Sequence, residues 1–187
     1  MYKRQGVLHP HGALATDPPG LVVCDVDSTV TRTEAIDLLA ECAGKADEIR
    51  GITARAMAGE LDFTQSLYAR VRCLEGLHIG ALEEAWKATV ITPGTAELVA
   101  AAHEVGAAVG LVSGGFTALV DPLAEQIGAD FAASHELEIV DDHLTGRVVG
   151  DIIDRAAKAT WLRRWASERG VALERTIALG DGANDLD

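Results

Sequence analysis

Two aspartates follow directly on a short apolar run near the start of the sequence. Leu21, Val22 and Val23 have the character of a buried strand, and Asp25 and Asp27 stand at its end. A strand sends residues i and i+2 to the same face, so both carboxylates enter one small volume and repel unless a cation joins them. A carboxylate beside a metal ion is a suitable nucleophile for a phosphoryl group. The pair therefore indicates phosphoryl chemistry, although an isolated Asp-x-Asp is more often a turn or a surface acid pair.

Polar residues also end two later apolar stretches. The segments VVCDVD, GLVSGG and IALGDGAND all change from apolar to polar or glycine-rich. Because parallel strands share one carboxyl edge, we expect a single cluster there. Its members are Asp25, Asp27, Ser113, Gly114, Asp181, Asn184 and Asp185. Clustered oxygen ligands suit Mg²⁺, whose charge would offset the repulsion between the first two aspartates.

The chemistry of these residues suggests separate roles. Asp25, nearest the strand, is the better nucleophile, and Asp27 would protonate the leaving oxygen and then take a proton from water. Ser113 and the backbone N–H groups around Gly114 would bind phosphate oxygens, with Lys158 as the counter-charge. The alternative interpretations are an ordinary turn residue for Ser113 and a solvated helix lysine for Lys158.

Strands alternate with helices along most of the chain, which predicts an α/β fold with a doubly wound parallel sheet covered on both faces. The patterns predict strands 21–25, 107–115 and 176–181, helices 95–105, 117–127 and 156–169, and a hairpin around 139–149. Thr92 is a plausible cap for the helix that follows it. Helical spacing dominates the segment after residue 34. We expect a loose tail (1–20), a discontinuous core domain (21–33 and 93–187) and an inserted all-helical cap domain (34–92).

DVDSTV, LVSGGF, Lys158 and GDGAND occur in the order and spacing of four motifs, and by them the chain resembles the haloacid dehalogenase superfamily of phosphotransferases. In the insertion, TEAIDLLA, AMAGELDFTQSLYARV and TPGT resemble the phosphoserine phosphatase family, and the similarity runs from about Leu21 to the last residue. The resemblance implies a Rossmann-like core with a helical (C1-type) cap. It also implies hydrolysis of O-phospho-L-serine to L-serine and phosphate through an aspartyl-phosphate, the last step of serine biosynthesis.

The resemblance carries site residues over position by position. It implies that Asp25 is phosphorylated and that Asp27 is the acid/base. The implied Mg²⁺ ligands are Asp25, the carbonyl of Asp27, and Asp181. The implied substrate-binding residues are Glu34, Met57, Phe63, Arg70, Ser113, Gly114, Lys158 and Asn184, with Asp185 in support.

The cap residues of this set match the chemistry of phosphoserine. Its ammonium and carboxylate call for one acid and one arginine outside the metal site, and Glu34 and Arg70 stand where the family has these groups. Met57 and Phe63 would form an apolar wall that closes over the substrate and excludes water. The alternative for Glu34 and Arg70 is that they are ordinary surface residues, and the alternative for Met57 and Phe63 is that they only form the core of the cap.

The composition argues against several classes of partner. The 29 acidic and 16 basic residues give a net charge of -13, which disfavours nucleic acid and anionic membranes. The three cysteines are far apart and suit reduced thiols, and the sequence shows neither an export signal nor a membrane span. The six histidines show no metal-ligand spacing. We therefore expect a cytoplasmic protein whose partner is a small molecule, O-phosphoserine.

The sequence ends shortly after Asn184, where family members continue through a helix, a strand and a closing helix. The C-terminal part of the core is therefore expected to be missing, which would leave strand 176–181 as an unprotected edge and the chain poorly stable and weakly active. Three alternatives stay open: a related phosphatase or phosphotransferase acting on another small phosphorylated metabolite, a catalytically silent metal-binding module, and an inactive fragment.

Overall fold

The computed structural model describes residues 12–182 of the 187-residue chain. Within these residues a five-stranded sheet has the order β4-β3-β2-β1-β5. The strands are β1 (Leu21–Cys24), β2 (Ala108–Phe116), β3 (Phe131–Val140), β4 (His143–Val149) and β5 (Thr176–Leu179). β1 pairs in parallel with β2 and β5, β2 pairs in parallel with β3, and β4 pairs antiparallel with β3. The predicted α/β fold is confirmed, and its strand order reverses at β1, where such sheets bind ligands.

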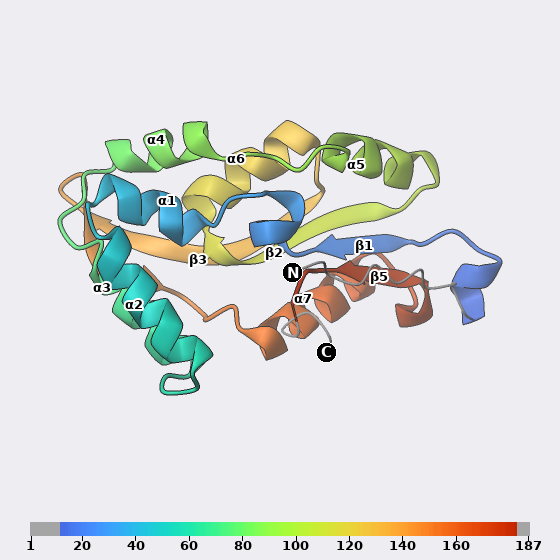
Figure 1. Cartoon of the computed structure of the whole chain (residues 1–187). Helices are drawn as coiled ribbons and strands as arrows, with labels where there is room; N and C mark the ends of the chain where they lie inside the picture. Colours follow the sequence, from blue (N-terminus) through green and yellow to red (C-terminus); the bar gives the residue numbers. More distant parts are fainter. Residues whose placement is uncertain (1–11, 183–187) are drawn as a thin grey trace.

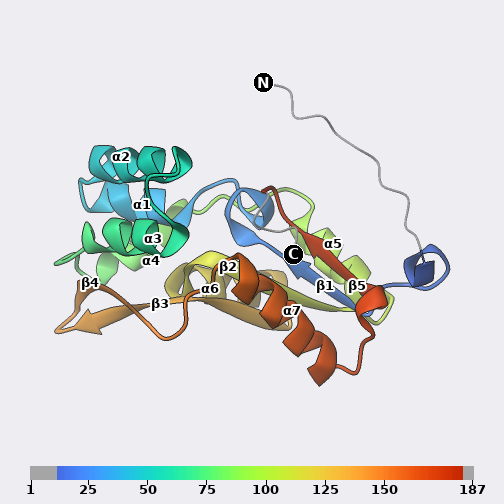
Figure 2. The same cartoon turned by 90° about the horizontal axis from the view of Figure 1, so that it is seen from below.

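Helices cover both faces of this sheet (Figures 1 and 2). They are α5 (Thr95–Glu104), α6 (Thr117–Ile127) and α7 (Arg155–Glu168). Alternate residues of β1 serve the two faces: Val22 packs in a cluster with α5 and α6, and Val23 packs with α7. Trp165 of α7 lies so close to β2 that a Cβ added at Gly110 would be 2.7 Å from its ring. Glycine at this position therefore lets α7 approach the sheet.

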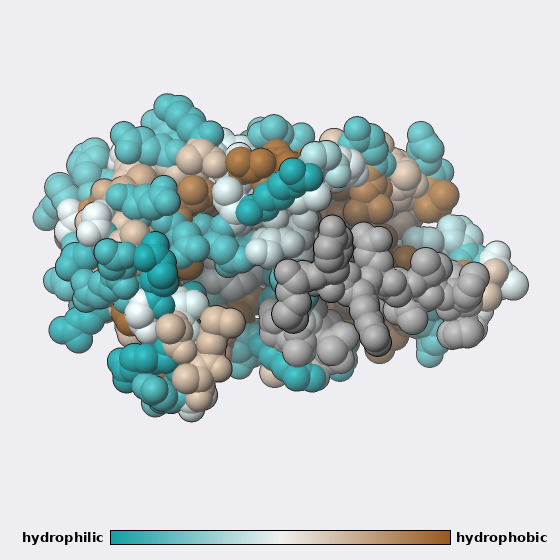
Figure 3. Space-filling view, in the orientation of Figure 1, coloured by the Kyte–Doolittle hydropathy of each residue, from teal (hydrophilic) through white to brown (hydrophobic). Residues whose placement is uncertain are grey.

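The inserted helical cap lies between β1 and α5 in the chain. Its helices are α1 (Ala35–Cys42), α2 (Ala46–Met57), α3 (Phe63–Arg72) and α4 (Gly80–Ala88). Their buried side chains, such as Leu39 and Leu74, share one hydrophobic cluster with Phe116 of β2 and Leu137 of β3. The cap therefore rests on the core through apolar contacts, and hydrophilic residues cover most of its face in Figure 3.

The two chain segments that join cap and core lie against each other. Thr31 and Ile91 form an isolated antiparallel bridge. The expectation that Thr92 caps the next helix was wrong, because α5 begins at Thr95 after Gly94 in a left-handed conformation (φ 92°). The Thr92 hydroxyl instead donates to the Thr29 carbonyl at 2.8 Å, which fixes the returning segment beside the turn that follows β1.

Residues 12–20, which the sequence places in a loose tail, are held against the core at their C-terminal end. A short 3₁₀-helix, η1, covers Gly12–Ala15. Arg175 Nη2 donates to the Pro18 carbonyl at 2.9 Å, and Gly20 is buried and donates its N–H to the Arg175 carbonyl. Among residues 12–182, no helix has the length and apolar character needed to cross a bilayer.

Candidate active site

The turn after β1 brings a carboxylate and an ammonium group together in the interior. Asp25 is 7% exposed, and its backbone N–H donates to the Leu179 carbonyl of β5 at 2.8 Å. Lys158, in the second turn of α7 and 9% exposed, donates from Nζ to Asp25 Oδ1 at 2.6 Å. The predicted nucleophile and the predicted counter-charge thus meet, although 133 positions separate them in the sequence.

Asp27 lies in the following turn, η2 (Val26–Val30), and its Oδ1 accepts a hydrogen bond from Ala35 N–H at 2.9 Å. Burial, with smaller contributions from Glu34 and Asp25, raises the pKa of Asp27 to about 7, although the Ala35 N–H and Lys158 act in the opposite direction. Ser28 has a left-handed backbone (φ 61°), and its hydroxyl donates to Glu34 Oε1 at 2.6 Å. The turn therefore orients Asp27 and Glu34 together.

β2 carries the Ser-Gly-Gly segment that the sequence assigns to phosphate binding. Ser113 is fully buried, and its Oγ accepts from Gly115 N–H at 2.8 Å. A Cβ added at Gly115 would lie 3.0 Å from both Asp27 Oδ2 and Ser113 Oγ, whereas one added at Gly114 would lie 3.5 Å from the Phe63 ring. Gly115 therefore lets β2 pass close to the Asp27 carboxylate, and Gly114 faces the cap.

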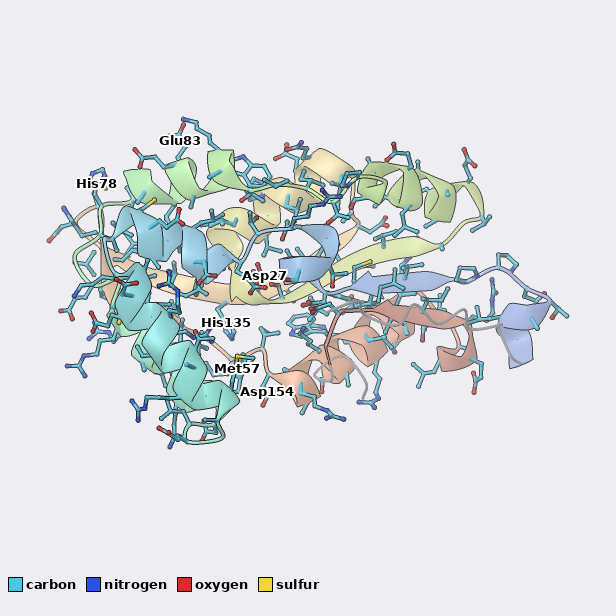
Figure 4. All side chains as sticks on the ribbon, in the orientation of Figure 1. Asp27, Met57, His78, Glu83, His135 and Asp154 are labelled. Carbon is cyan, nitrogen blue, oxygen red and sulfur yellow. The ribbon has the colours of Figure 1, made fainter. Side chains whose placement is uncertain are left out.

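An open pocket of about 540 Å³ lies between these elements and the cap. The predicted site residues that line it are Asp25, Asp27, Glu34, Phe63, Arg70, Gly114, Lys158 and Asp181. Met57 does not line the pocket; it is 86% exposed at the end of α2 and points toward the gap between cap and core in Figure 4. Asn184 and Asp185 lie outside the described residues.

The structure also brings residues to the pocket that the sequence did not single out. Asp154 and Arg155 line it at the start of α7, and Asp154 Oδ1 accepts from Ala157 N–H at 2.8 Å as the N-cap of that helix. An aspartate directly before a helical segment is a capping signal, so Asp154 could have been found. His135 of β3 contacts Gly114 from behind the pocket, and no sequence pattern marks it.

The carboxylates of the pocket decide whether the expected Mg²⁺ could be held there. Among residues 12–182, no three His, Cys, Asp or Glu side chains form a ready cage for a metal ion. Mg²⁺ needs no such cage, because it usually takes one or two protein carboxylates and completes its shell with water and phosphate oxygens. Asp25 and Asp181 line the same pocket and carry carboxylates of this kind. The residues present therefore fit Mg²⁺.

Comparison with known proteins agrees with this geometry. A phosphoserine phosphatase of Streptomyces coelicolor is 53% identical over 167 residues, which cover 89% of this chain and 41% of that protein. A phosphoserine phosphatase of Streptococcus thermophilus is 48% identical over 167 residues, which cover 89% of this chain and 78% of that protein. The chain thus spans less than half of the Streptomyces protein and most of the Streptococcus one.

A solved structure described as a phospho-aspartyl intermediate analogue of phosphoserine phosphatase has a TM-score of 0.84 and 39% sequence identity. The match covers 91% of this chain and 81% of that one. The family model of haloacid dehalogenase-like hydrolases matches residues 22–187, a range that includes all of β1 but its first residue, the cap and the motif residues of the pocket. The chain therefore belongs to the haloacid dehalogenase-like hydrolase family.

Proposed function

We propose that the chain is a phosphoserine phosphatase, which hydrolyses O-phospho-L-serine to L-serine and phosphate. The observation that carries the proposal is one pocket that combines the buried Asp25–Lys158 pair with Glu34 and Arg70. The pair suits phosphoryl transfer, and the other two residues suit the charged groups of an amino acid. The relatives named as phosphoserine phosphatases support this choice of substrate.

Asp25 is the nucleophile of the proposed reaction. One of its carboxylate oxygens attacks phosphorus, the bond from phosphorus to the serine oxygen breaks, and Asp27 gives its proton to that oxygen. The aspartyl-phosphate then reacts with water, which transfers a proton to Asp27 as it attacks phosphorus. Phosphate leaves, and Asp25 regains its carboxylate. Lys158 and the N–H groups of the Ser-Gly-Gly segment bind the phosphate oxygens throughout.

The side chains of Asp25 and Asp181 and the carbonyl of Asp27 would hold Mg²⁺. When bound, the ion supplies positive charge that stabilises the phosphoryl oxygens. Among the residues of the chain, Lys158 also supplies positive charge, since its Nζ donates to Asp25 Oδ1 at 2.6 Å. The phosphoryl group would thus enter a site with cationic partners for its oxygens, although the protein has a net charge of -13.

Glu34 and Arg70 select the serine part of the substrate in this proposal. Both line the pocket on its cap side. Ser28 fixes one oxygen of Glu34, and the Ser66 carbonyl accepts from Arg70 Nε at 3.2 Å. Each group therefore has a defined orientation and retains other polar atoms for the substrate: a carboxylate oxygen for the ammonium, and guanidinium N–H groups for the carboxylate.

The cap supplies the wall that would close over the substrate. Phe63 lines the pocket opposite Gly114 and is 42% exposed. Met57 is more exposed and points toward the same gap (Figure 4), so a small rotation of α2 and α3 toward the core would bury both side chains. Closure of this kind would keep bulk water from the serine leaving group during the first step.

The proposed setting is the cytoplasm and the last step of serine biosynthesis. The cysteines Cys24, Cys42 and Cys73 are free thiols in the structure. The net charge of -13 opposes binding to nucleic acid or an anionic membrane. A small anionic metabolite with its own ammonium group is compatible with such a protein, because the cations it needs are local to the pocket.

The test is phosphate release from L-phosphoserine, with phosphothreonine and an aryl phosphate alongside, with and without Mg²⁺. We expect Mg²⁺-dependent release that prefers phosphoserine and falls by at least ~10³-fold in Asp25→Asn, with the circular dichroism spectrum unchanged. Arg70→Ala should mainly reduce the preference for phosphoserine over the aryl phosphate, by about tenfold. Release that persists in Asp25→Asn would exclude the proposed nucleophile, and a preference for another phosphate ester would favour the related metabolite phosphatase.

A further inference from the structure

His135 is a fully buried histidine that the mechanism does not use. It lies on β3, and Figure 4 places it between the lower end of the cap and the segment that leads into α7. Its ring centroid is 6.2 Å from that of Phe63, which lines the pocket from the cap. A polar ring in the interior needs hydrogen-bond partners, because its desolvation is otherwise uncompensated.

The strand pairing beside His135 is irregular at the phosphate-binding segment. Val112 pairs with Ala133, and the next pair is Phe116 with His135, so four residues of β2 match two of β3. The two extra residues fall within Ser113–Gly115 and form a bulge. A bulge breaks the regular ladder and leaves backbone groups without their strand partners. His135 is the residue of β3 at which regular pairing with β2 resumes after the bulge, opposite Phe116.

Both ring nitrogens of His135 bond to backbone groups of different segments. Nδ1 lies 3.1 Å from the Gly114 carbonyl, and Nε2 lies 2.8 Å from the Ile153 N–H. A carbonyl only accepts and an amide N–H only donates, so Nδ1 carries the proton and Nε2 presents its lone pair. The partners therefore select the neutral imidazole. Burial lowers the pKa of His135 as well, in agreement with this assignment.

The two bonded segments carry the two halves of the phosphate site. Gly114 belongs to the bulge with Ser113. Ile153 precedes Asp154, which caps α7, and the helix then brings Lys158 to Asp25. We propose that His135 is a positioning residue that sets the distance between the Ser113–Gly115 bulge and the start of α7, and with it the fit of the site to a phosphate group. This inference rests on the proposed phosphatase function and adds His135 to the residues that determine its specificity for phosphate.

The test compares three substitutions of His135 in the whole chain. His135→Leu keeps similar volume and removes both hydrogen bonds, His135→Asn retains a donor near the Gly114 carbonyl, and His135→Gln retains an acceptor near the Ile153 N–H. The control is His103→Leu, which removes another histidine hydrogen bond, 2.9 Å long to Asp130, at a residue that does not line the pocket. The measurements are kcat and KM for phosphoserine, and the affinity for inorganic phosphate by calorimetry with Mg²⁺ present.

We expect His135→Leu to weaken phosphate binding and kcat/KM by about tenfold at a temperature where it is fully folded, with partial recovery in the Asn and Gln variants. His103→Leu should lower only the melting temperature. Phosphate affinity and kcat/KM within about twofold of the parent in all folded His135 variants would overturn the positioning role. A parent that binds phosphate but hydrolyses no phosphoserine would overturn the proposed function alone, because binding would still report on His135. A parent that does neither would overturn both.

Discussion

At the scale of single residues, the Asp25–Lys158 pair is the feature least explained by stability. Both side chains are nearly buried, and they meet at 2.6 Å. Removing two charges from water costs several kcal/mol each, and a buried ion pair often stabilises a fold no more than well-packed apolar residues do. The pair is therefore better explained by chemistry: it keeps a carboxylate charged and oriented in a place where phosphorus can reach it.

Ser28 offers a test of how the amino-acid end of the substrate is recognised. Its hydroxyl donates to Glu34 Oε1 at 2.6 Å, and its backbone is left-handed (φ 61°), a conformation that glycine adopts without strain. Ser28→Gly should therefore free the Glu34 carboxylate without disturbing the turn. We expect the KM for phosphoserine to rise about three- to tenfold, with kinetics on an aryl phosphate, which lacks the ammonium group, unchanged. Equal losses on both substrates would show that Ser28 acts on Asp27 or the turn instead.

The sequence predicted those site residues whose chemistry is visible in short segments. The spacing of Asp25 and Asp27 after an apolar run predicts that their carboxylates lie close together, and both residues line the same pocket. The sequence did not predict a role for His135, because a lone histidine in a strand has no local signal and its two hydrogen-bond partners lie 21 and 18 positions away in the chain. Met57 was expected at the pocket wall but does not line the pocket, because it is the last residue of α2 and its side chain is 86% exposed.

At the scale of elements, the bulge of β2 determines how closely the phosphate-binding segment approaches Asp27. A Cβ at Gly115 would lie 3.0 Å from Asp27 Oδ2, whereas a Cβ at Gly114 would make an ordinary contact of 3.5 Å with Phe63. Gly115→Ala should therefore displace the acid/base and reduce kcat by about a hundredfold. Gly114→Ala is the matched control in the same bulge, and we expect its kcat to fall by less than about tenfold. Steady-state kinetics of the two variants decide the matter, and the reverse order of the two losses would contradict this explanation.

Helix and strand bounds were predicted well where the local pattern is unambiguous. Helix α6 has the expected limits, Thr117 to Ile127, because the chain leaves β2 directly into an apolar helical pattern and ends at Gly128 in a left-handed conformation (φ 78°). The start of α5 was predicted correctly at Thr95, but its capping residue was not, because the Thr92 hydroxyl bonds to the Thr29 carbonyl across the cap–core junction. That contact joins residues 63 positions apart and leaves no trace in the local sequence.

At the scale of the whole molecule, the proposed anionic substrate has to approach a strongly acidic protein. The net charge of -13 repels phosphate esters at long range, and salt screens this repulsion beyond about 10 Å. Inside the pocket Arg70, Arg155 and Lys158 supply three cationic groups among five acidic side chains, those of Asp25, Asp27, Glu34, Asp154 and Asp181. The net charge of the pocket therefore remains negative until a cation binds, and the negative charge of the whole protein favours the binding of that cation.

Mg²⁺ should consequently stabilise the folded chain. A ligand that binds only the folded state at a hundredfold excess over its Kd adds about 2.7 kcal/mol to the free energy of unfolding. For a chain of this size this corresponds to a rise in Tm of about 5–10 °C. NaCl at equal ionic strength is the control for screening, and Asp121→Asn, an exposed substitution on α6, is the control for the loss of one negative charge. Calorimetric melts should show the Mg²⁺ shift in the parent and in Asp121→Asn, and its loss in Asp25→Asn. A shift that NaCl reproduces, or that Asp25→Asn retains, would show that Mg²⁺ acts on the general charge of the protein and not through the carboxylates of the pocket.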